Sequence, residues 1–259
     1  QHDGLDYAYM AFDVTEEEMP KVFESIRLLN MRGGNFTMPC KNIAAQLVDK
    51  LSPAAEIIGA CNVFVNDDGV ITGHITDGVG FVKNLELNGA PVKDKKVVVL
   101  GAGGAATAIQ VQLALDGAKE VNIFNIKDKF WANGEETVKK IRENTDCVVN
   151  LYDLGDKEKL REEIADSYLF AQATGVGMKP LEGQSVVPDE TFFRPDLIVT
   201  DTVYAPRETE TLRLAKKAGC KTMNGLGMML FQGDAAFHLW TGKHMPIDHM
   251  KEVLDIKYD

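Results

Sequence analysis

The segment VVVLGAGGAATAI, residues 97–109, constrains the fold of this chain more than any other feature. The β-branched start of this segment is typical of a buried strand. Residues 103–117, which overlap its end, are small and have the composition of a helix. Gly101, Gly103 and Gly104 lie between the two. Such a turn lets a pyrophosphate approach the amides of a helix N-terminus. The segment therefore predicts dinucleotide binding, although a turn needed only for packing would look similar.

Apolar strands alternate with helical segments on either side of this turn. The alternation predicts a parallel, doubly wound Rossmann sheet, which we assign to residues 78–230. A helix at 77–89 is expected to lead into it. The expected strands occupy residues 95–101, 120–126, 147–154, 167–174 and 196–203.

A second α/β lobe is predicted from residues 1–77 together with 231–259, with the active site in the cleft between the lobes. Thr15 and Glu18 have the spacing of a capping box at the start of a helix, and the DDG of residues 67–69 is typical of a hairpin turn. The strands expected here are 6–14, 33–38 and the hairpin 61–76, and the helices are 15–29, 41–51, 225–243 and 246–256.

The charge balance excludes two classes of partner. The chain has 39 acidic and 28 basic residues, a net charge of −11, whereas nucleic-acid and anionic-membrane surfaces attract basic proteins. We therefore expect neither partner. The start of the chain lacks the basic and apolar regions of a signal peptide, so a cytoplasmic location is expected. The four cysteines and five histidines form no recognisable ligand pattern, so no metal site is predicted and the thiols are expected to be reduced.

An acidic residue follows the second strand of the predicted Rossmann sheet. Asp128 stands where such folds place the group that binds the adenosine ribose, and a carboxylate there would repel a 2′-phosphate. Lys127 would have the opposite effect. We predict NAD as the preferred cofactor, with tolerance of NADP. The alternative is an ordinary helix-start acid beside a surface lysine.

Three polar residues before the glycine turn suggest chemistry. Lys41, Asn62 and Asp77 each follow a strand or a hairpin arm. Singly, each has a plain structural explanation: a solvated helix-start charge, a turn amide and a helix N-cap.

Six ordered motifs give these residues a common context. GNFTMPCK, IGACNVF, GHITDGVGF, VLGAGGAATAI, DTVYAPRETETL and NGLGMMLFQGDAAFHLWTGK resemble, in this order, the motifs of shikimate dehydrogenases. The resemblance runs from about Tyr9 to Lys243. VGMKPLE, FNIKDKF and LWTGK are most similar to the quinate/shikimate dehydrogenase branch, which uses NAD or NADP.

The resemblance implies reversible hydride transfer between a nicotinamide cofactor and a ring alcohol of shikimate or quinate. Lys41 and Asp77 match the catalytic pair of the family, and alcohol oxidation needs such an acid–base group near the reacting oxygen. It implies polyol-binding roles for Tyr9, Thr37, Asn62, Thr76 and Gln232. It implies cofactor-binding roles for Ala102, Gly103, Gly104, Ala105, Asn125, Lys127, Asp128, Phe130, Met178, Val203, Tyr204 and Gly225.

The chain also departs from the family pattern. The family begins with an additional strand and helix whose SLSP-type motif binds the substrate carboxylate, and this sequence starts after that point. Ile75, Cys40 and Ile126 replace an Asn, a His or Asn, and an Arg that are usual in the family, and Ala171-Gln172-Ala173 replaces its NxT text. These changes bear on substrate identity and cofactor preference.

Two rival functions stay open at this point. The first is a non-catalytic sensor with a dehydrogenase-like fold that binds metabolites of the shikimate pathway. The second is a dehydrogenase of another cyclic polyol. Retention of both Lys41 and Asp77 argues against the sensor, because a binding protein has less need of that pair. A homodimer is a further expectation.

Overall fold

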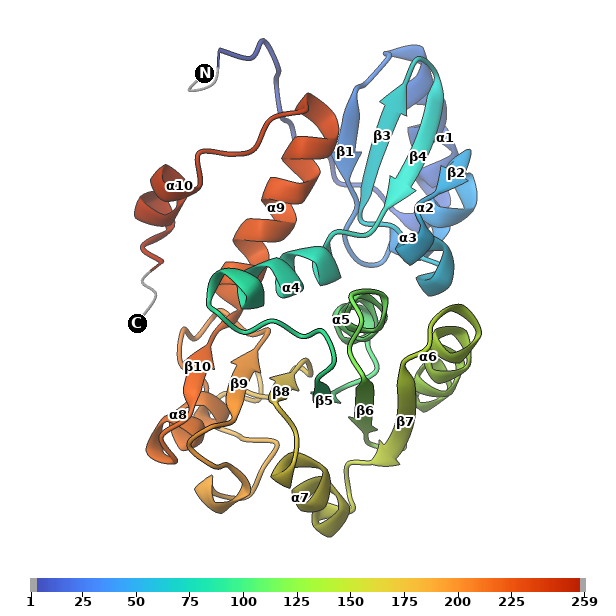
Figure 1. Cartoon of the computed structure of the whole chain (residues 1–259). Coiled ribbons are helices and arrows are strands. Elements are labelled where there is room, and N and C mark those ends of the chain that lie inside the picture. Colours follow the sequence, from blue (N-terminus) through green and yellow to red (C-terminus); the bar gives the residue numbers. More distant parts are fainter. Residues whose placement is uncertain (1–3, 257–259) are drawn as a thin grey trace.

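A computed structural model describes residues 4–256 and contains two sheets, one in each of two lobes (Figure 1). The six-stranded sheet forms the lower lobe and the four-stranded sheet the upper lobe in this view. The chain is therefore an α/β protein with a Rossmann-like lobe, as predicted.

The six-stranded sheet is parallel throughout, in the order β10-β9-β8-β5-β6-β7. The strand order reverses at β5, which is the topological switch point where α/β folds of this kind bind ligands. The glycine turn follows β5 directly. The strands are β5 (Lys96–Leu100), β6 (Glu120–Asn125), β7 (Val148–Asp153), β8 (Leu169–Gln172), β9 (Ile198–Asp201) and β10 (Lys221–Met223).

Apolar side chains cover both faces of this sheet. Val97 and Val99 belong to one buried cluster, and Val98 and Leu100 belong to another, so alternate residues of β5 contribute to opposite layers. The helices of this lobe are α5 (Gly104–Leu115), α6 (Trp131–Asn144), α7 (Lys157–Ala165) and α8 (Glu210–Lys217), with the short helix η2 (Glu190–Phe192).

The four-stranded sheet has the order β1-β3-β4-β2. Its hairpin turns at Asp68 and Gly69, which have φ angles of 52° and 93°, as the tight turns of twisted hairpins require. Phe23, Phe36 and Phe64 stack in the core of this lobe. Its elements are η1 (Glu16–Glu18), α1 (Met19–Leu28), β1 (Gly33–Asn35), α2 (Lys41–Leu47), β2 (Lys50–Leu51), α3 (Pro53–Ile58), β3 (Val63–Asp67) and β4 (Val70–His74).

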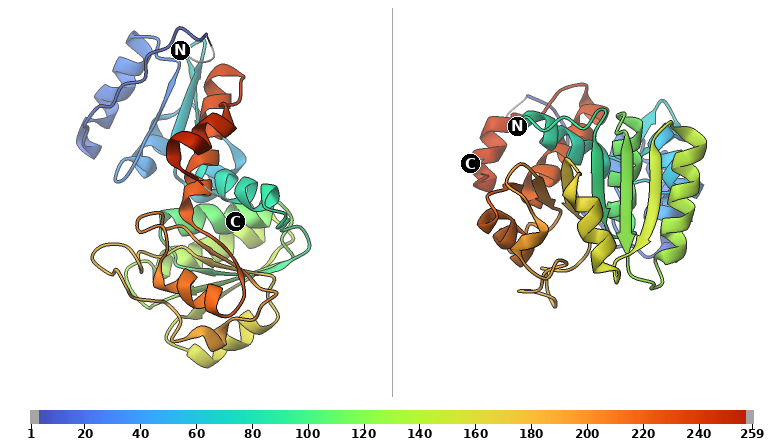
Figure 2. Two further views of the ribbon diagram at one scale, coloured as in Figure 1. Left: turned by 90° about the vertical axis from the view of Figure 1, so that its left-hand side faces the viewer. Right: turned by 60° about the horizontal axis from the view of Figure 1, so that its bottom comes forward.

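Two long helices join the lobes. α4 (Asp77–Leu87) packs against α9 (Gly225–Thr241) and α5, and α9 runs from the six-stranded lobe to the upper lobe (Figures 1 and 2). α10 (Ile247–Leu254) lies beside them on the outside. Since α4 and α9 pack on each other across the predicted borders at 77/78 and 230/231, the division into domains at these residues remains a proposal.

The structure corrects two predicted elements and adds a helix. The strand at 6–14 is wrong: residues 4–15 have no regular structure, and among the described residues this segment belongs to neither sheet. The helix predicted at 41–51 ends at Leu47, because Lys50 and Leu51 pair with β4. A further helix that was not predicted, α3, begins at Pro53 and is capped by Ser52.

The predicted capping box is present. The Thr15 amide donates to the Glu18 carboxylate, as the capping-box spacing predicted. The four cysteines are free and buried. Within residues 4–256, no helix combines the length and the apolar character that a membrane span requires.

Candidate active site

A cleft of about 610 Å³ lies where α2, α4 and α9 meet. Six of the seven residues predicted for catalysis or polyol binding line it: Tyr9, Thr37, Lys41, Asn62, Asp77 and Gln232. Tyr204, predicted for cofactor binding, lines the same cleft from the six-stranded lobe. One residue predicted for the cofactor therefore reaches the same cavity as the six predicted for catalysis or polyol binding.

Lys41 and Asp77 form an ion pair in this cleft. The Nζ atom of Lys41 lies 2.8 Å from Oδ2 of Asp77, and the two side chains are 20% and 15% exposed. Each residue begins a helix, α2 and α4 respectively, so the backbone fixes both side chains at their bases. The Lys41 carbonyl also accepts a hydrogen bond from the Cys61 amide at 3.0 Å, which ties α2 to the hairpin. A partly exposed lysine beside a carboxylate can donate a proton to a ligand oxygen in the cleft as the ammonium, or accept one as the neutral amine.

An amide and hydroxyl cluster forms the floor of the cleft. The Thr76 amide donates to Oδ1 of Asn62 at 2.8 Å, and Nδ2 of Asn62 donates to the Thr76 hydroxyl at 3.1 Å. The Thr76 hydroxyl lies 3.3 Å from Oε1 of Gln232. Thr76 is only 2% exposed and does not line the cleft. It orients Asn62 and Gln232, so a direct polyol contact by Thr76 stays a prediction.

Several cleft residues were not predicted from the sequence. The Tyr9 hydroxyl donates to Oδ1 of Asn35 at 2.6 Å, and the Tyr9 ring lies 6.0 Å from that of Trp240. Nε1 of Trp240 donates to the Phe64 carbonyl at 3.0 Å. The spacing of four residues along α9 could have revealed part of this lining, because it places Gln232, Ala236 and Trp240 on one face of the helix. The unpredicted lining residues are Asn35, Phe36, Gly233, Ala236, Phe237, Trp240 and Met245.

The glycine turn fits a dinucleotide. Gly103 is the N-cap of α5 and supplies no side-chain cap, so the first amides of the helix remain available to an anion. A Cβ atom on Gly103 or Gly104 would meet nothing within 4 Å, which leaves open space over these amides. Gly101 has a φ of 107°, and a Cβ there would lie 2.8 Å from the Ala173 carbonyl oxygen. Ala102 is buried, and Ala105 is exposed on the first turn of α5.

The loop after β6 is held by its own side chains. Nδ2 of Asn125 donates to Oδ1 of Asp128 at 3.0 Å, and the Phe130 amide donates to the same oxygen at 2.9 Å. Lys127 is exposed, with its Nζ atom 3.7 Å from Oδ2 of Asp153. Asp128 thus shapes the loop through Oδ1, and ribose binding stays a prediction for its second oxygen.

The turn after β9 carries Tyr204, the predicted cofactor residue that lines the cleft. Asp201 is 2% exposed, and burial raises its pKa to about 6. Its carboxylate accepts the Val203 amide at 2.9 Å and the Thr209 hydroxyl at 2.7 Å, which fixes the turn that carries Tyr204. A Cβ on Gly225 would lie 2.0 Å from the Thr202 carbonyl oxygen, so this close approach requires glycine.

The structure does not bring Met178, predicted for the nicotinamide, to the cleft. It lies in the loop after β8, is 45% exposed and is not among the residues that line the cleft. Its place beside the nicotinamide stays a prediction.

Known proteins resemble this chain along its whole length. A family profile described as the shikimate dehydrogenase substrate binding domain matches residues 1–64, and one described as the shikimate 5'-dehydrogenase C-terminal domain matches residues 225–254. The shikimate dehydrogenase (NADP(+)) of Listeria monocytogenes is 54% identical over 251 residues, which cover 97% of this chain and 86% of the relative.

Solved structures give the same result. A shikimate 5-dehydrogenase from Listeria monocytogenes, in complex with shikimate and NAD, has a TM-score of 0.96 and 54% identity, covering 98% of this chain and 88% of that one. A quinate dehydrogenase from Corynebacterium glutamicum, in complex with NAD, has a TM-score of 0.81 and 29% identity, covering 91% and 82%. The chain belongs to the shikimate dehydrogenase family.

Proposed function

We propose that this chain catalyses reversible hydride transfer between a ring alcohol of shikimate and a nicotinamide dinucleotide. The observation that carries the proposal is the Lys41–Asp77 pair at 2.8 Å in a cleft that also contains Asn62, Gln232 and Tyr204. Polyol hydroxyls need several fixed donors and acceptors, and the cleft presents them beside an acid–base pair. The relatives' names and the shikimate bound to one solved relative support this substrate.

Lys41 would move the proton of the reaction. When the alcohol is oxidised, hydride leaves the carbinol carbon and the Lys41 amine takes the hydroxyl proton. When the ketone is reduced, the Lys41 ammonium returns a proton to the oxygen. Asp77 orients the ammonium and can accept a second ligand hydroxyl. The bound dinucleotide supplies the hydride acceptor or donor.

A nicotinamide absorbance assay tests the proposal. Wild type should reduce the dinucleotide with shikimate, and Lys41→Ala should lose about 10²–10⁴-fold in kcat. Binding of shikimate without turnover by wild type would instead favour a metabolite sensor.

We include quinate as a slower substrate, since the sequence resembles the quinate/shikimate branch. A parallel assay with quinate decides that extension.

We propose that the chain accepts both NAD and NADP. NADP is supported by the name of the Listeria relative, whereas Asp128 at the end of β6 favours an unphosphorylated ribose. Asp128→Asn keeps the Oδ1 acceptor that shapes the loop and removes the charge. It should raise kcat/KM for NADP relative to NAD. An unchanged ratio would show that Asp128 does not read the ribose.

A further inference from the structure

The segment between α9 and α10, residues 242–246, turns back along α9. Gly242 has a φ of 72° and ends the helix, with its amide donating to the His238 carbonyl at 2.8 Å. The Lys243 amide then donates to the Thr241 hydroxyl at 3.1 Å. The reversal brings Met245 into the cleft beside Gly233.

A buried carboxylate on α9 holds this segment. Oδ1 of Asp234 accepts the Met245 amide at 2.7 Å, and Oδ2 lies 2.9 Å from Nδ1 of His244. The Asp234 side chain is only 12% exposed. A buried carboxylate is unfavourable unless it is hydrogen-bonded. Here each carboxylate oxygen binds one residue of the reversing segment, Oδ1 the Met245 amide and Oδ2 the His244 ring.

A second contact supports His244. Its ring stacks on that of His238, with centroids 4.4 Å apart and planes 6° from parallel. His238 lies four residues after Asp234, so both residues are on one face of α9. The segment is therefore attached to α9 at the Met245 backbone and at two points of the His244 side chain.

Met245 presents an apolar group to a cleft that also contains the polar side chains of Asn62 and Gln232. Its Cε atom would lie 3.5 Å from a Cβ built on Gly233, the residue next to Gln232. A polyol hydroxyl directed at this thioether would lose its hydrogen bond to water and gain no partner. A ring that presents C–H groups there would lose nothing.

We propose that Met245 is a specificity-determining wall of the polyol cleft and that Asp234 is the positioning residue that holds it there. This rests on the proposed function, because it takes the cleft to be a polyol site. Asp234 does not contact the ligand. Its effect passes through the Met245 backbone and His244.

A double-mutant cycle on the dissociation constant of shikimate tests the proposal. Calorimetric titration without dinucleotide should give about a tenfold weaker Kd for Asp234→Ala and for Met245→Ala, and no further loss in the double variant. Kinetic assays should show the same rise in KM for shikimate, with kcat and the KM for dinucleotide within about threefold. Additive losses, or an equal rise in the KM for dinucleotide, would overturn the proposal.

Three further variants separate positioning from folding. Asp234→Asn keeps an acceptor for the Met245 amide and should recover most of the affinity. His244→Ala changes a side chain that is 68% exposed, so it should fold and weaken shikimate binding by about threefold. Asp248→Asn, a fully exposed acid on α10, is the matched control and should change neither Kd nor KM. Full affinity in His244→Ala and Asp234→Ala would sink the positioning role.

The specificity role has its own readout. Met245→Gln keeps the length of the side chain and adds hydrogen-bonding atoms, so it should raise the quinate-to-shikimate ratio of kcat/KM several-fold, because quinate carries one more hydroxyl. An unchanged ratio contradicts a specificity role. Since Kd is measured without turnover, a wild type that binds shikimate but does not oxidise it fails the proposed function and still tests the role of Asp234.

Discussion

Two lysines with nearly equal exposure have opposite surroundings. Lys41 is 20% exposed, and among the described residues its ammonium pairs with the single carboxylate of Asp77. Lys96 is 19% exposed and lies between Glu163 at 2.7 Å and Asp166 at 2.5 Å. Burial alone therefore does not distinguish a chemical group from a structural one. Both lysines line a cavity; what differs, among the described residues, is the number of acidic partners, one for Lys41 and two for Lys96.

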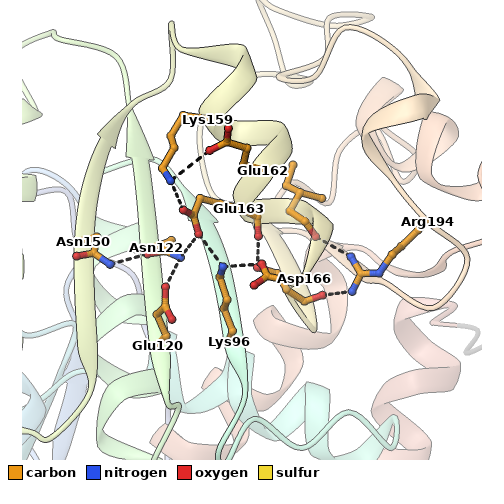
Figure 3. A network of polar contacts seen from close by, with 11 residues as sticks. Lys96, Glu120, Asn122, Asn150, Lys159, Glu162, Glu163, Asp166 and Arg194 are labelled. Carbon is orange, nitrogen blue, oxygen red and sulfur yellow. Dashed lines mark hydrogen bonds and ion pairs between the residues drawn. The ribbon is translucent and has the colours of Figure 1, made fainter.

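The Lys96 network lies at the amino end of β5, opposite the glycine turn (Figure 3). The Glu163 carboxylate also forms an ion pair with Lys159 at 2.6 Å and accepts a hydrogen bond from Nδ2 of Asn122 at 2.8 Å. Burial disfavours the charge of Glu163, but the hydrogen bonds and charges of Lys159 and Lys96 outweigh burial and lower its pKa. Likewise, burial opposes the charge of Lys96, while Asp166 and Glu163 outweigh it and raise the pKa. These groups satisfy one another, so we assign this network to stability.

Replacing each of the two lysines by alanine should give the largest contrast between loss of activity and loss of stability. Lys41→Ala should lower kcat by about 10²–10⁴-fold while the free energy of unfolding changes by less than about 1 kcal/mol, because water in the cleft can solvate Asp77. Lys96→Ala should leave kcat within about twofold and destabilise the fold by about 2 kcal/mol. Steady-state kinetics and urea unfolding measure both. A large loss of kcat in Lys96→Ala would break the comparison.

Removal of the buried acid should have the next largest effect. Glu163→Gln leaves Lys96 and Asn122 facing a neutral amide and should cost about 3 kcal/mol of unfolding free energy. The kcat and KM of the enzyme should not change at 25 °C. A stability loss below about 1 kcal/mol would show that the network is dispensable.

The difference in stability between wild type and Glu163→Gln should depend on pH. Since the folded-state pKa of Glu163 is below its unfolded value of about 4.5, its contribution is complete above that value and is lost as pH falls through the folded pKa. The stability difference between wild type and Glu163→Gln should therefore be constant near neutrality and shrink below about pH 4.5. A difference that grows on acidification would contradict the lowered pKa.

An exposed member of the network gives the smallest effect. The Asp166 side chain is 68% exposed, so water screens its pair with Lys96. Asp166→Asn should change the unfolding free energy by about 0.5 kcal/mol or less, and added salt should reduce that further. Thermal unfolding at low and high ionic strength checks this.

The sequence predicted the parts of the fold that local patterns encode. The β-branched run before Gly101 and the DDG at 67–69 specify their strand, turn and hairpin through residues close together in the chain. The strand predicted at 6–14 was wrong because a strand also needs a neighbour, which an alternating pattern cannot guarantee. β2 and β10 were missed because short strands carry few residues of pattern.

The candidate site was predicted unevenly for the same reason. Lys41, Asn62 and Asp77 stand in ordered motifs, and the structure brings all three to one cleft. Asn35 and Trp240 also stand in these motifs but were given no role, and Met245 reaches the cleft through the reversal after α9, which lies beyond the last motif. The bond between Asp234 and His244 joins residues ten positions apart across a helix end, so helical periodicity does not predict it.

Helix α9 sets the distance between the turn after β9 and the cleft. Its first residue, Gly225, donates its amide to the Val203 carbonyl at 3.0 Å, and Gln232 lines the cleft seven residues later. Seven residues are about two turns and about 10 Å, so both ends of this interval lie on the same side of the helix. One inserted residue would rotate Gln232 by about 100°. The position of Gln232 in the cleft thus depends on the number of residues in this interval as well as on their identity.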